Sequence, residues 1–379
     1  MIRLIRSPRT PERGAMPLNI VNVMWSGGSP YMSIHKVHRD LLVHAHSDAR
    51  VCNWLLLGDG LCSSFGQVRC WHLPQRLLKG RMPYVLAMPW LRWRLRKALV
   101  EASVDLLLLD GLGVARLLLP LVRQTPGVRI IVLFHGKTRL STSDVRLFRS
   151  LPPEQLSIAA VSATLARSLE QGLGCPVGTL RMSLDPQAFT QQLLDREEAR
   201  QALALPVQGP LLGAVGRLVE GKGFEMLIEA FAQVRERQPD LRLAILGGGP
   251  LRARLEAQAK ALGVEGSVHF GGHRDDLIRL YPAFDWLLVP SRSEGLGLVV
   301  QEAVLSGVPV FCSDLPVFRE QLGEAGCYLP VGDLGAWADA IGQCSRRDAA
   351  AQAHEQWRAL APQERWEAFK EGSAGLLKR

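Results

Sequence analysis

The chain has 379 residues, of which 47% are hydrophobic and 21% are charged, and it contains 36 glycines. This composition excludes an intrinsically disordered or fibrous protein, and the length predicts two or three domains. Residues 1–190 hold 24 Lys+Arg and 11 Asp+Glu, a net charge of +13, whereas the remainder carries −4. We therefore expect the first half to meet an anionic surface.

Seven cysteines are dispersed along the chain and none forms a CxxC pair. This pattern favours reduced cytoplasmic thiols over a disulfide framework or a metal site. Residues 1–17 are basic but lack an apolar core, so we expect a disordered leader rather than a secretory signal. No apolar run approaches the roughly 18 residues of a membrane span. We expect a cytoplasmic protein, either soluble or peripheral at the inner face of the cytoplasmic membrane.

Short apolar segments in the first half predict buried strands with helices between them. They read LNIVNVMW (18–25), VCNWLLL (51–57), VDLLLLD (104–110), RIIVLFH (129–135) and LSIAAVS (156–162). Strands that are apolar throughout and alternate with helices indicate a parallel sheet that is covered on both faces. We assign this first domain to residues 18–190.

The segment 75–101, QRLLKGRMPYVLAMPWLRWRLRKALVE, is the most basic part of the first half. It has seven Lys/Arg before its first acidic residue, with Trp90 and Trp93 among them. Basic side chains beside indoles suit a membrane interface with anionic headgroups. A nucleic-acid patch is one alternative, although no nucleic-acid fold accompanies it, and a solvated helix whose tryptophans face the core is another.

The strand–helix alternation restarts after the polar stretch 191–206. The expected strands are PLLGAVG (210–216), LRLAIL (241–246), SVHFGG (267–272), DWLLVPS (285–291), PVFCS (309–313) and CYLP (327–330). We expect an α/β protein with two doubly wound, Rossmann-like domains in series. The second domain is assigned to residues 191–355, and a C-terminal helix in 356–379 is expected to pack back on the first. Ligands bind at the carboxyl ends of such strands.

A glycine-rich loop after the first strand of the second domain carries two cations before a helix. It reads GAVGRLVEGKGF and contains Gly216, Arg217 and Lys222. An arginine fork and a lysine point charge at a helix N-terminus suit a diphosphate. A solvated loop with incidental basic residues is the alternative interpretation.

The segment SRSEGLGLVVQEAVLSG (291–307) places one carboxylate in a glycine-rich turn and another in a helix. The backbone amides of Gly295, Leu296 and Gly297 can meet phosphate oxygens at the helix N-terminus. Glu302 can accept two hydrogen bonds from a vicinal diol, as acidic residues do for ribose, and Glu294 can bind the hydroxyls of a second sugar. A solvated helix residue and a loop charge are the alternative.

Two further loops give weaker signals. Gly248 in AILGGGP lies at the end of a strand, where glycines admit a nucleotide or simply form a tight turn. Backbone groups near His273 and Arg274 could hold the edge of a base, although a surface histidine is more often solvated.

The segments GRLVEGKGFEMLIEAF, LAILGGGPLRARLE and VHFGGHRDDLIRLYPAFDWLLVPSRSEGLGLVVQEAVLSGVPV occur in an order and spacing that resemble a known family. They are similar to the nucleotide-sugar domain of the GT-B retaining glycosyltransferases of family 4 (group 1), which includes enzymes of the lipopolysaccharide-core type. The resemblance is dense over about residues 210–330. It implies that Arg217 and Lys222 grip the donor diphosphate, that Glu302 holds the ribose and that Glu294 contacts the transferred sugar.

The first domain resembles this family more loosely. Gly27 and Gly28 stand where the family keeps a glycine-rich loop, and VLFHG is similar to a strand that ends in a histidine near the donor sugar, here His135. Without the family, His135 would be interpreted as a core or capping histidine. The stretch RMSLDPQAF departs from the family, because Met182 and Ser183 replace its Asn and Gly.

The resemblance implies an enzyme that moves a hexose-type sugar from a nucleotide diphosphate sugar to a glycan or lipid-linked acceptor, in lipopolysaccharide or cell-envelope polysaccharide synthesis. Arg217, Lys222 and the amides near Gly297 would neutralise the departing diphosphate, so we expect no cofactor and no metal. The expected partners are this donor, this acceptor and an anionic membrane surface, with no nucleic acid. A nucleotide-sugar 2-epimerase of the same fold and a catalytically degenerate GT-B scaffold are the alternatives.

Overall fold

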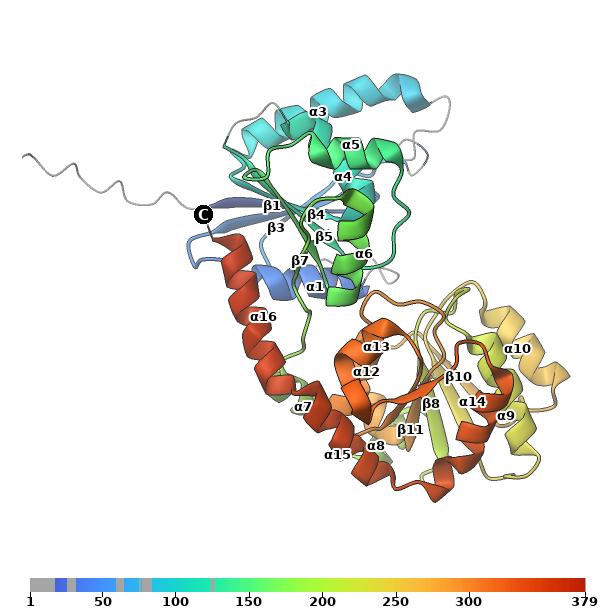
Figure 1. Ribbon diagram of the computed structural model, residues 1–379. Coiled ribbons are helices and arrows are strands. Elements are labelled where there is room, and N and C mark those ends of the chain that lie inside the picture. Colours follow the sequence, from blue (N-terminus) through green and yellow to red (C-terminus); the bar gives the residue numbers. More distant parts are fainter. Residues whose placement is uncertain are drawn as a thin grey trace, which may run out of the picture.

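The computed structural model describes residues 18–25, 32–58, 65–74, 76, 84–123 and 127–378. The expected leader 1–17 and the glycines Gly27 and Gly28 lie outside the described residues. Two parallel sheets, one in each half of the chain, organise the molecule (Figure 1).

The first sheet has the strand order β3-β2-β1-β4-β5-β6-β7, and every pair in it is parallel. Its strands are β1 (Asn19–Met24), β2 (Arg50–Leu55), β3 (Gln67–Cys70), β4 (Leu106–Asp110), β5 (Arg129–Phe134), β6 (Leu156–Ala160) and β7 (Gly178–Thr179). Among the described residues of this half, the helices are α1 (Met32–Leu42), α3 (Met88–Glu101), α4 (Gly111–Val122), α5 (Thr142–Arg149) and α6 (Ala163–Leu173). The central strands are buried because they are apolar throughout, as expected for a sheet covered on both faces.

The second sheet has the order β10-β9-β8-β11-β12-β13 and is also parallel. Its strands are β8 (Leu211–Val215), β9 (Arg242–Leu246), β10 (Val268–Gly272), β11 (Trp286–Val289), β12 (Val310–Ser313) and β13 (Cys327–Leu329). Its helices are α9 (Phe224–Arg235), α10 (Arg252–Ala261), α11 (Leu277–Leu280), α12 (Leu298–Leu305), α13 (Pro316–Leu322) and α14 (Leu334–Gln343). In both sheets the strand order reverses at the first strand of the domain, which is the doubly wound topology.

The junction between the sheets contains α7 (Pro186–Thr190) and α8 (Arg196–Ala202). Asp185 caps α7 by accepting hydrogen bonds from Gln187 N and Ala188 N. The buried Arg200 of α8 donates to the carbonyl of Ala283 (2.9 Å), so α8 is fixed to the second domain. Within the polar stretch 191–206 between the two domains, α8 is therefore part of the second domain.

Two helices at the C-terminal end return the chain to the first domain. They are α15 (Ala349–Leu360) and α16 (Pro362–Leu377), and the boundary expected at residue 356 falls inside α15. Ala361 adopts a left-handed conformation (φ 45°) and precedes a proline at the first helical position, which separates the two helices. Figure 1 shows α16 beside α1, and the Arg129 guanidinium donates to the carbonyl of Lys378.

A carboxylate of the second domain caps a helix of the first. Glu320 of α13 accepts hydrogen bonds from the amides of Ala163 (2.9 Å) and Thr164 (2.8 Å) at the start of α6. Arg181, which follows β7, donates to the same carboxylate (2.9 Å). Because the first amides of a helix have no partner within it, Glu320 stabilises α6 and joins the two domains at one point.

None of the helices in the described ranges is long and apolar enough to cross a bilayer. The helix α3 covers only the last part of the basic segment 75–101, since a 3₁₀ turn over Tyr84–Ala87 precedes it. Trp90 and Trp93 of α3 are 52% and 60% exposed. The interpretation in which these tryptophans face the core is therefore wrong.

Candidate active site

The loops after β8 and β11 place an ion pair at the carboxyl edge of the second sheet. The Lys222 ammonium lies 2.5 Å from an Oε1 of Glu294, and the Ser291 hydroxyl donates to the same oxygen (2.7 Å). A backbone hydrogen bond from Arg292 N to Gly221 O (2.8 Å) ties the two loops together. Residues 72 positions apart are thus brought together because their strands are neighbours in the sheet.

Glu302 faces both domains from the middle of α12. Its carboxylate accepts a hydrogen bond from the buried Tyr281 hydroxyl (2.6 Å) and lies 4.0 Å from the Lys36 ammonium of α1. Burial, and then the nearby Glu302, raise the pKa of Tyr281 well above its usual value, so Tyr281 remains a donor. Sequence patterns did not identify Tyr281 or Lys36, because each reaches Glu302 only through tertiary packing.

The backbone of Gly295 touches the first domain. A Cβ atom built on Gly295 would lie 1.9 Å from the carbonyl oxygen of His135, so only glycine fits this position. The Ser162 hydroxyl, which caps α6 as its place before a helix suggests, also donates to the carbonyl of Gly295 (2.7 Å). The loop with Glu294 and the end of β5 therefore meet across the two sheets.

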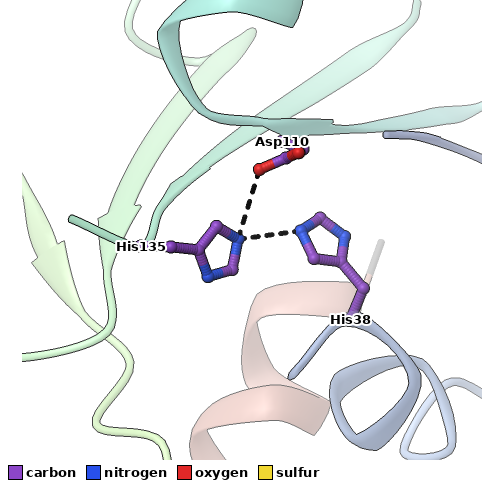
Figure 2. A group of neighbouring side chains, drawn as sticks. All are labelled: His38, Asp110 and His135. Atoms are coloured by element: carbon purple, nitrogen blue, oxygen red, sulfur yellow. Dashed lines mark hydrogen bonds and ion pairs between the residues drawn. The ribbon is translucent and has the colours of Figure 1, made fainter. Parts of the chain in front are cut away.

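His135 forms a cluster of three polar side chains with His38 and Asp110 (Figure 2). The Nε2 of His135 lies 3.0 Å from the Nε2 of His38 on α1 and 3.6 Å from Asp110 at the end of β4. Burial lowers the pKa of His135 to about 4. Burial raises the pKa of Asp110 to about 6, although a hydrogen bond from the Trp25 amide acts to lower it. His38 and Asp110 were not identified from the sequence, since a histidine within a helix and an aspartate after a strand are common features.

These three side chains are the one group in the described ranges whose histidine and acidic atoms are close enough together to hold a metal ion. Two histidines and a carboxylate are a donor set that transition metals accept. However, two imidazole nitrogens at 3.0 Å are at hydrogen-bond distance and share one proton, whereas a metal would require a lone pair from each. In the protein alone the two imidazoles form a hydrogen-bonded pair.

The remaining predicted residues lie at the same edge of the second sheet. Gly216 and Gly248 follow β8 and β9, and Arg217 is exposed. His273 hydrogen-bonds Asp275 (3.2 Å), and Arg274 forms a bidentate ion pair with Asp276 (2.7 and 2.8 Å), so both side chains bind their own loop.

The helix α12 begins at this edge. Gly297 is its N-cap with a φ of 76°, and the carbonyl of buried Leu296 accepts a hydrogen bond from Gln321 (2.5 Å). Gln301 of α12 is also buried, and its side-chain amide donates to the carbonyl of Met182 (3.1 Å). Met182 and Ser183, which depart from the family pattern, are buried beside α12.

Residues 195–372 match the family described as Glycosyl transferases group 1. A D-inositol 3-phosphate glycosyltransferase of Corynebacterium urealyticum is 36% identical over 158 residues, which is 39% of this chain and 37% of that protein. The lipopolysaccharide core biosynthesis glycosyltransferase LpsE of Rhizobium meliloti is 38% identical over 146 residues (38% of this chain, 42% of LpsE). A GDP-mannose-dependent alpha-(1-6)-phosphatidylinositol monomannoside mannosyltransferase of Mycolicibacterium smegmatis is 29% identical over 293 residues (70% and 74%).

The whole chain is similar in structure to several solved proteins. Sucrose-phosphate synthase from Thermosynechococcus elongatus superposes with a TM-score of 0.76 at 18% identity, over 95% of this chain and 98% of that one. HepE of Anabaena, solved in complex with UDP and glucose, gives the same score and identity, over 95% and 99%. These likenesses confirm the expected fold of two Rossmann-like domains.

The chain spans about two fifths of the length of the curated relatives named first. The chain therefore has the two-domain GT-B fold, and its second domain is similar to the glycosyl transferases group 1 family.

Proposed function

We propose that the protein is a retaining glycosyltransferase that moves a hexose-type sugar from a nucleotide diphosphate sugar to a glycan or lipid-linked acceptor. The observation that carries this proposal is that polar groups of both domains meet where Gly295 touches His135 and where Glu302 lies 4.0 Å from Lys36. The Lys222–Glu294 pair and Glu302 come from the second domain, whereas His135 and Lys36 come from the first. Such a site at facing strand ends is where α/β folds bind nucleotides.

In the proposed reaction, different groups of the site contact different parts of the donor. The oxygen of the acceptor hydroxyl bonds to the anomeric carbon as the bond to the diphosphate oxygen breaks, and the hydroxyl proton passes to the departing diphosphate on the same face. Arg217, Lys222 and the amides at the start of α12 would stabilise the negative charge that develops there. With those cations in place, we propose that transfer needs no divalent metal.

Glu302 and Glu294 would bind the polyhydroxylated parts of the donor. Ionised carboxylates only accept hydrogen bonds, so they suit the hydroxyls of ribose and of the transferred sugar. Tyr281 holds one oxygen of Glu302 and leaves the other toward Lys36. We propose that Glu302 binds the ribose and that Glu294, beside Lys222, binds the sugar.

We also propose that the acceptor is lipid-linked and that the first domain works at the inner face of the cytoplasmic membrane, in lipopolysaccharide or envelope polysaccharide synthesis. The excess charge of residues 1–190 and the exposed indoles of α3 support this proposal. Two of the relatives have names that concern lipid-linked glycans, LpsE and the phosphatidylinositol monomannoside mannosyltransferase.

A panel of nucleotide sugars tests the proposal. One nucleotide sugar and its nucleotide diphosphate should raise the melting temperature, and transfer to a lipid-linked glycan should retain the anomeric configuration without added metal. Failure of every nucleotide to bind would refute the enzyme assignment. Epimerisation of the donor without an acceptor, or binding without turnover, would instead identify a 2-epimerase or a scaffold.

A further inference from the structure

A chain of hydrogen bonds runs from a backbone carbonyl in the first domain to His135. The Asn53 amide on β2 donates to the carbonyl of Phe65 (2.7 Å), and the Asn22 amide on β1 donates to the Asn53 oxygen (2.8 Å). The Asn22 oxygen lies 2.7 Å from Nδ1 of His38, whose Nε2 lies 3.0 Å from Nε2 of His135. Asn22, Asn53 and His38 are all buried.

The carbonyl at one end fixes the direction of every bond in this chain. A carbonyl only accepts, so Asn53 must present its N–H₂ to Phe65 and its oxygen to Asn22. Asn22 must then donate to Asn53 and accept from His38, which places a proton on His38 Nδ1.

His38 is neutral, because its burial, and next the nearby His135, lower its pKa well below the usual value. A neutral imidazole carries one proton, so the Nε2 of His38 is an acceptor and the Nε2 of His135 must be the donor. Asp110 lies 3.6 Å from that nitrogen, beyond hydrogen-bond distance.

The other ring nitrogen of His135 is left without a proton. Figure 2 shows it pointing away from His38 and Asp110, and it forms no hydrogen bond with the described residues. The carbonyl of the same residue touches Gly295, next to Glu294. His135 therefore borders the candidate site, and Nδ1 is the ring nitrogen left to accept a hydrogen bond.

We propose that Asn53, Asn22 and His38 form a relay that locks His135 as an Nε2–H tautomer, so that its Nδ1 accepts a hydrogen bond from a hydroxyl of the transferred sugar. Asn22 and His38 are positioning residues in this arrangement. The locked tautomer makes His135 an obligate acceptor, which selects a sugar that donates a proton at the contacted position. The tautomer stands on the protein alone, whereas the identity of the ligand rests on the proposed function.

The tautomer can be measured directly by ¹⁵N NMR of histidine-labelled protein, with the His135 signals assigned by their loss in His135→Gln. We expect Nε2 to carry the proton and Nδ1 to be bare. A proton on Nδ1 of His135 in the wild-type protein would overturn the proposal, whatever the nucleotide panel shows.

Two isosteric substitutions in the same buried chain should have opposite results. In Asn22→Asp the carboxylate favours a doubly protonated His38, which donates from Nε2 and forces the His135 proton onto Nδ1. In Asn53→Asp, Asn22 still donates to one oxygen at position 53, and the other oxygen carries a proton that it donates to the carbonyl of Phe65, so the tautomer of His135 should be unchanged. A shared outcome for both variants would contradict the relay.

Activity gives a second readout that a purely structural role would not change. Monodeoxyfluoro analogues of the donor identified by the panel replace one hydroxyl at a time with a group that cannot donate. In the wild type, one position should lose roughly tenfold in kcat/KM on fluorination, and this discrimination should disappear in Asn22→Asp and persist in Asn53→Asp. Equal discrimination in both variants would contradict the contact between His135 and the sugar hydroxyl. If no nucleotide binds but NMR shows the expected tautomer, the proposed function is refuted and the relay is not.

Discussion

Lys222 and Glu294 form an ion pair at 2.5 Å between the loops that follow β8 and β11. If Lys222 binds the donor diphosphate, its loss removes a cation and also leaves the Glu294 charge unbalanced beside the ligand. We expect Lys222→Ala to lower kcat/KM by about 10²- to 10³-fold. The double variant with Glu294→Gln should bind the nucleotide diphosphate more tightly than Lys222→Ala alone, although transfer stays slow.

Steady-state kinetics and nucleotide titration of the two single variants and the double variant check this prediction. Lys260→Ala, an exposed lysine on α10, is the matched control and should behave as the wild type. Additive effects of the two changes on nucleotide affinity would show that the ion pair has no part in binding.

The hydrogen bond from Tyr281 to Glu302 should set the affinity for the nucleotide. Tyr281→Phe removes a charge-assisted bond of about 1.5 kcal/mol that orients the carboxylate, which corresponds to roughly tenfold in affinity. We expect a rise in the KM for the donor, a parallel rise in the Kd for the nucleotide diphosphate and little change in kcat. Tyr328→Phe, which loses a hydroxyl bond to the carbonyl of Gly323, is the control. A fall in kcat alone would place Glu302 away from the ribose.

The sequence indicates the parts of the site that follow strands. Lys222, Glu294 and Glu302 stand in or just beyond glycine-rich loops after apolar runs, and parallel strands bring such loops to one edge. His38 and Lys36 lie within an ordinary helix, so no local pattern distinguishes them from surface or core residues.

The fold was predictable for similar reasons. Long apolar strands such as β4 and β5 predict a buried sheet, whereas β3 and β7 were not predicted. The sequence of β3, QVRC, is largely exposed at an edge, and β7 has two residues, so neither has an apolar run.

Glu320 should make the joint between the domains sensitive to acid. Burial acts to raise the pKa of Glu320, but hydrogen bonds from Ala163 and Thr164 and the charge of Arg181 outweigh it and hold the pKa below its ordinary 4.5. A carboxyl with a lowered folded-state pKa stabilises the protein above the unfolded value, and this stabilisation is lost as the pH falls through the folded-state pKa.

Glu320→Gln should therefore lower the free energy of unfolding by about 2 kcal/mol near neutral pH. Thermal melts of the wild type and the variant should converge as the pH falls below about 4.5. Glu324→Gln, an exposed carboxylate four residues further on, should match the wild type throughout. A gap between wild type and Glu320→Gln that persists in acid would mean that the carboxylate charge is not the cause.

The exposed face of α3 should bind anionic membranes. Trp90 and Trp93 project from it, and Arg94 and Lys97 lie over their rings at 4.9 and 5.7 Å from the ring centres. Each basic residue near an anionic surface contributes about 1 kcal/mol. Replacing four exposed cations of α3 with serine should therefore abolish flotation with anionic liposomes, and that variant carries Arg92→Ser, Arg94→Ser, Arg96→Ser and Lys97→Ser.

A control of equal charge separates a local surface from the overall field of the protein. Four exposed cations of the second domain are replaced in the control variant, namely Arg254, Lys260, Arg346 and Arg358. This variant should still float with anionic liposomes, because attraction to headgroups falls off within a Debye length of the surface. Neither variant should bind neutral liposomes, which carry no anionic headgroups. Equal loss in both variants would attribute binding to net charge, and unchanged binding in the α3 variant would exclude this face.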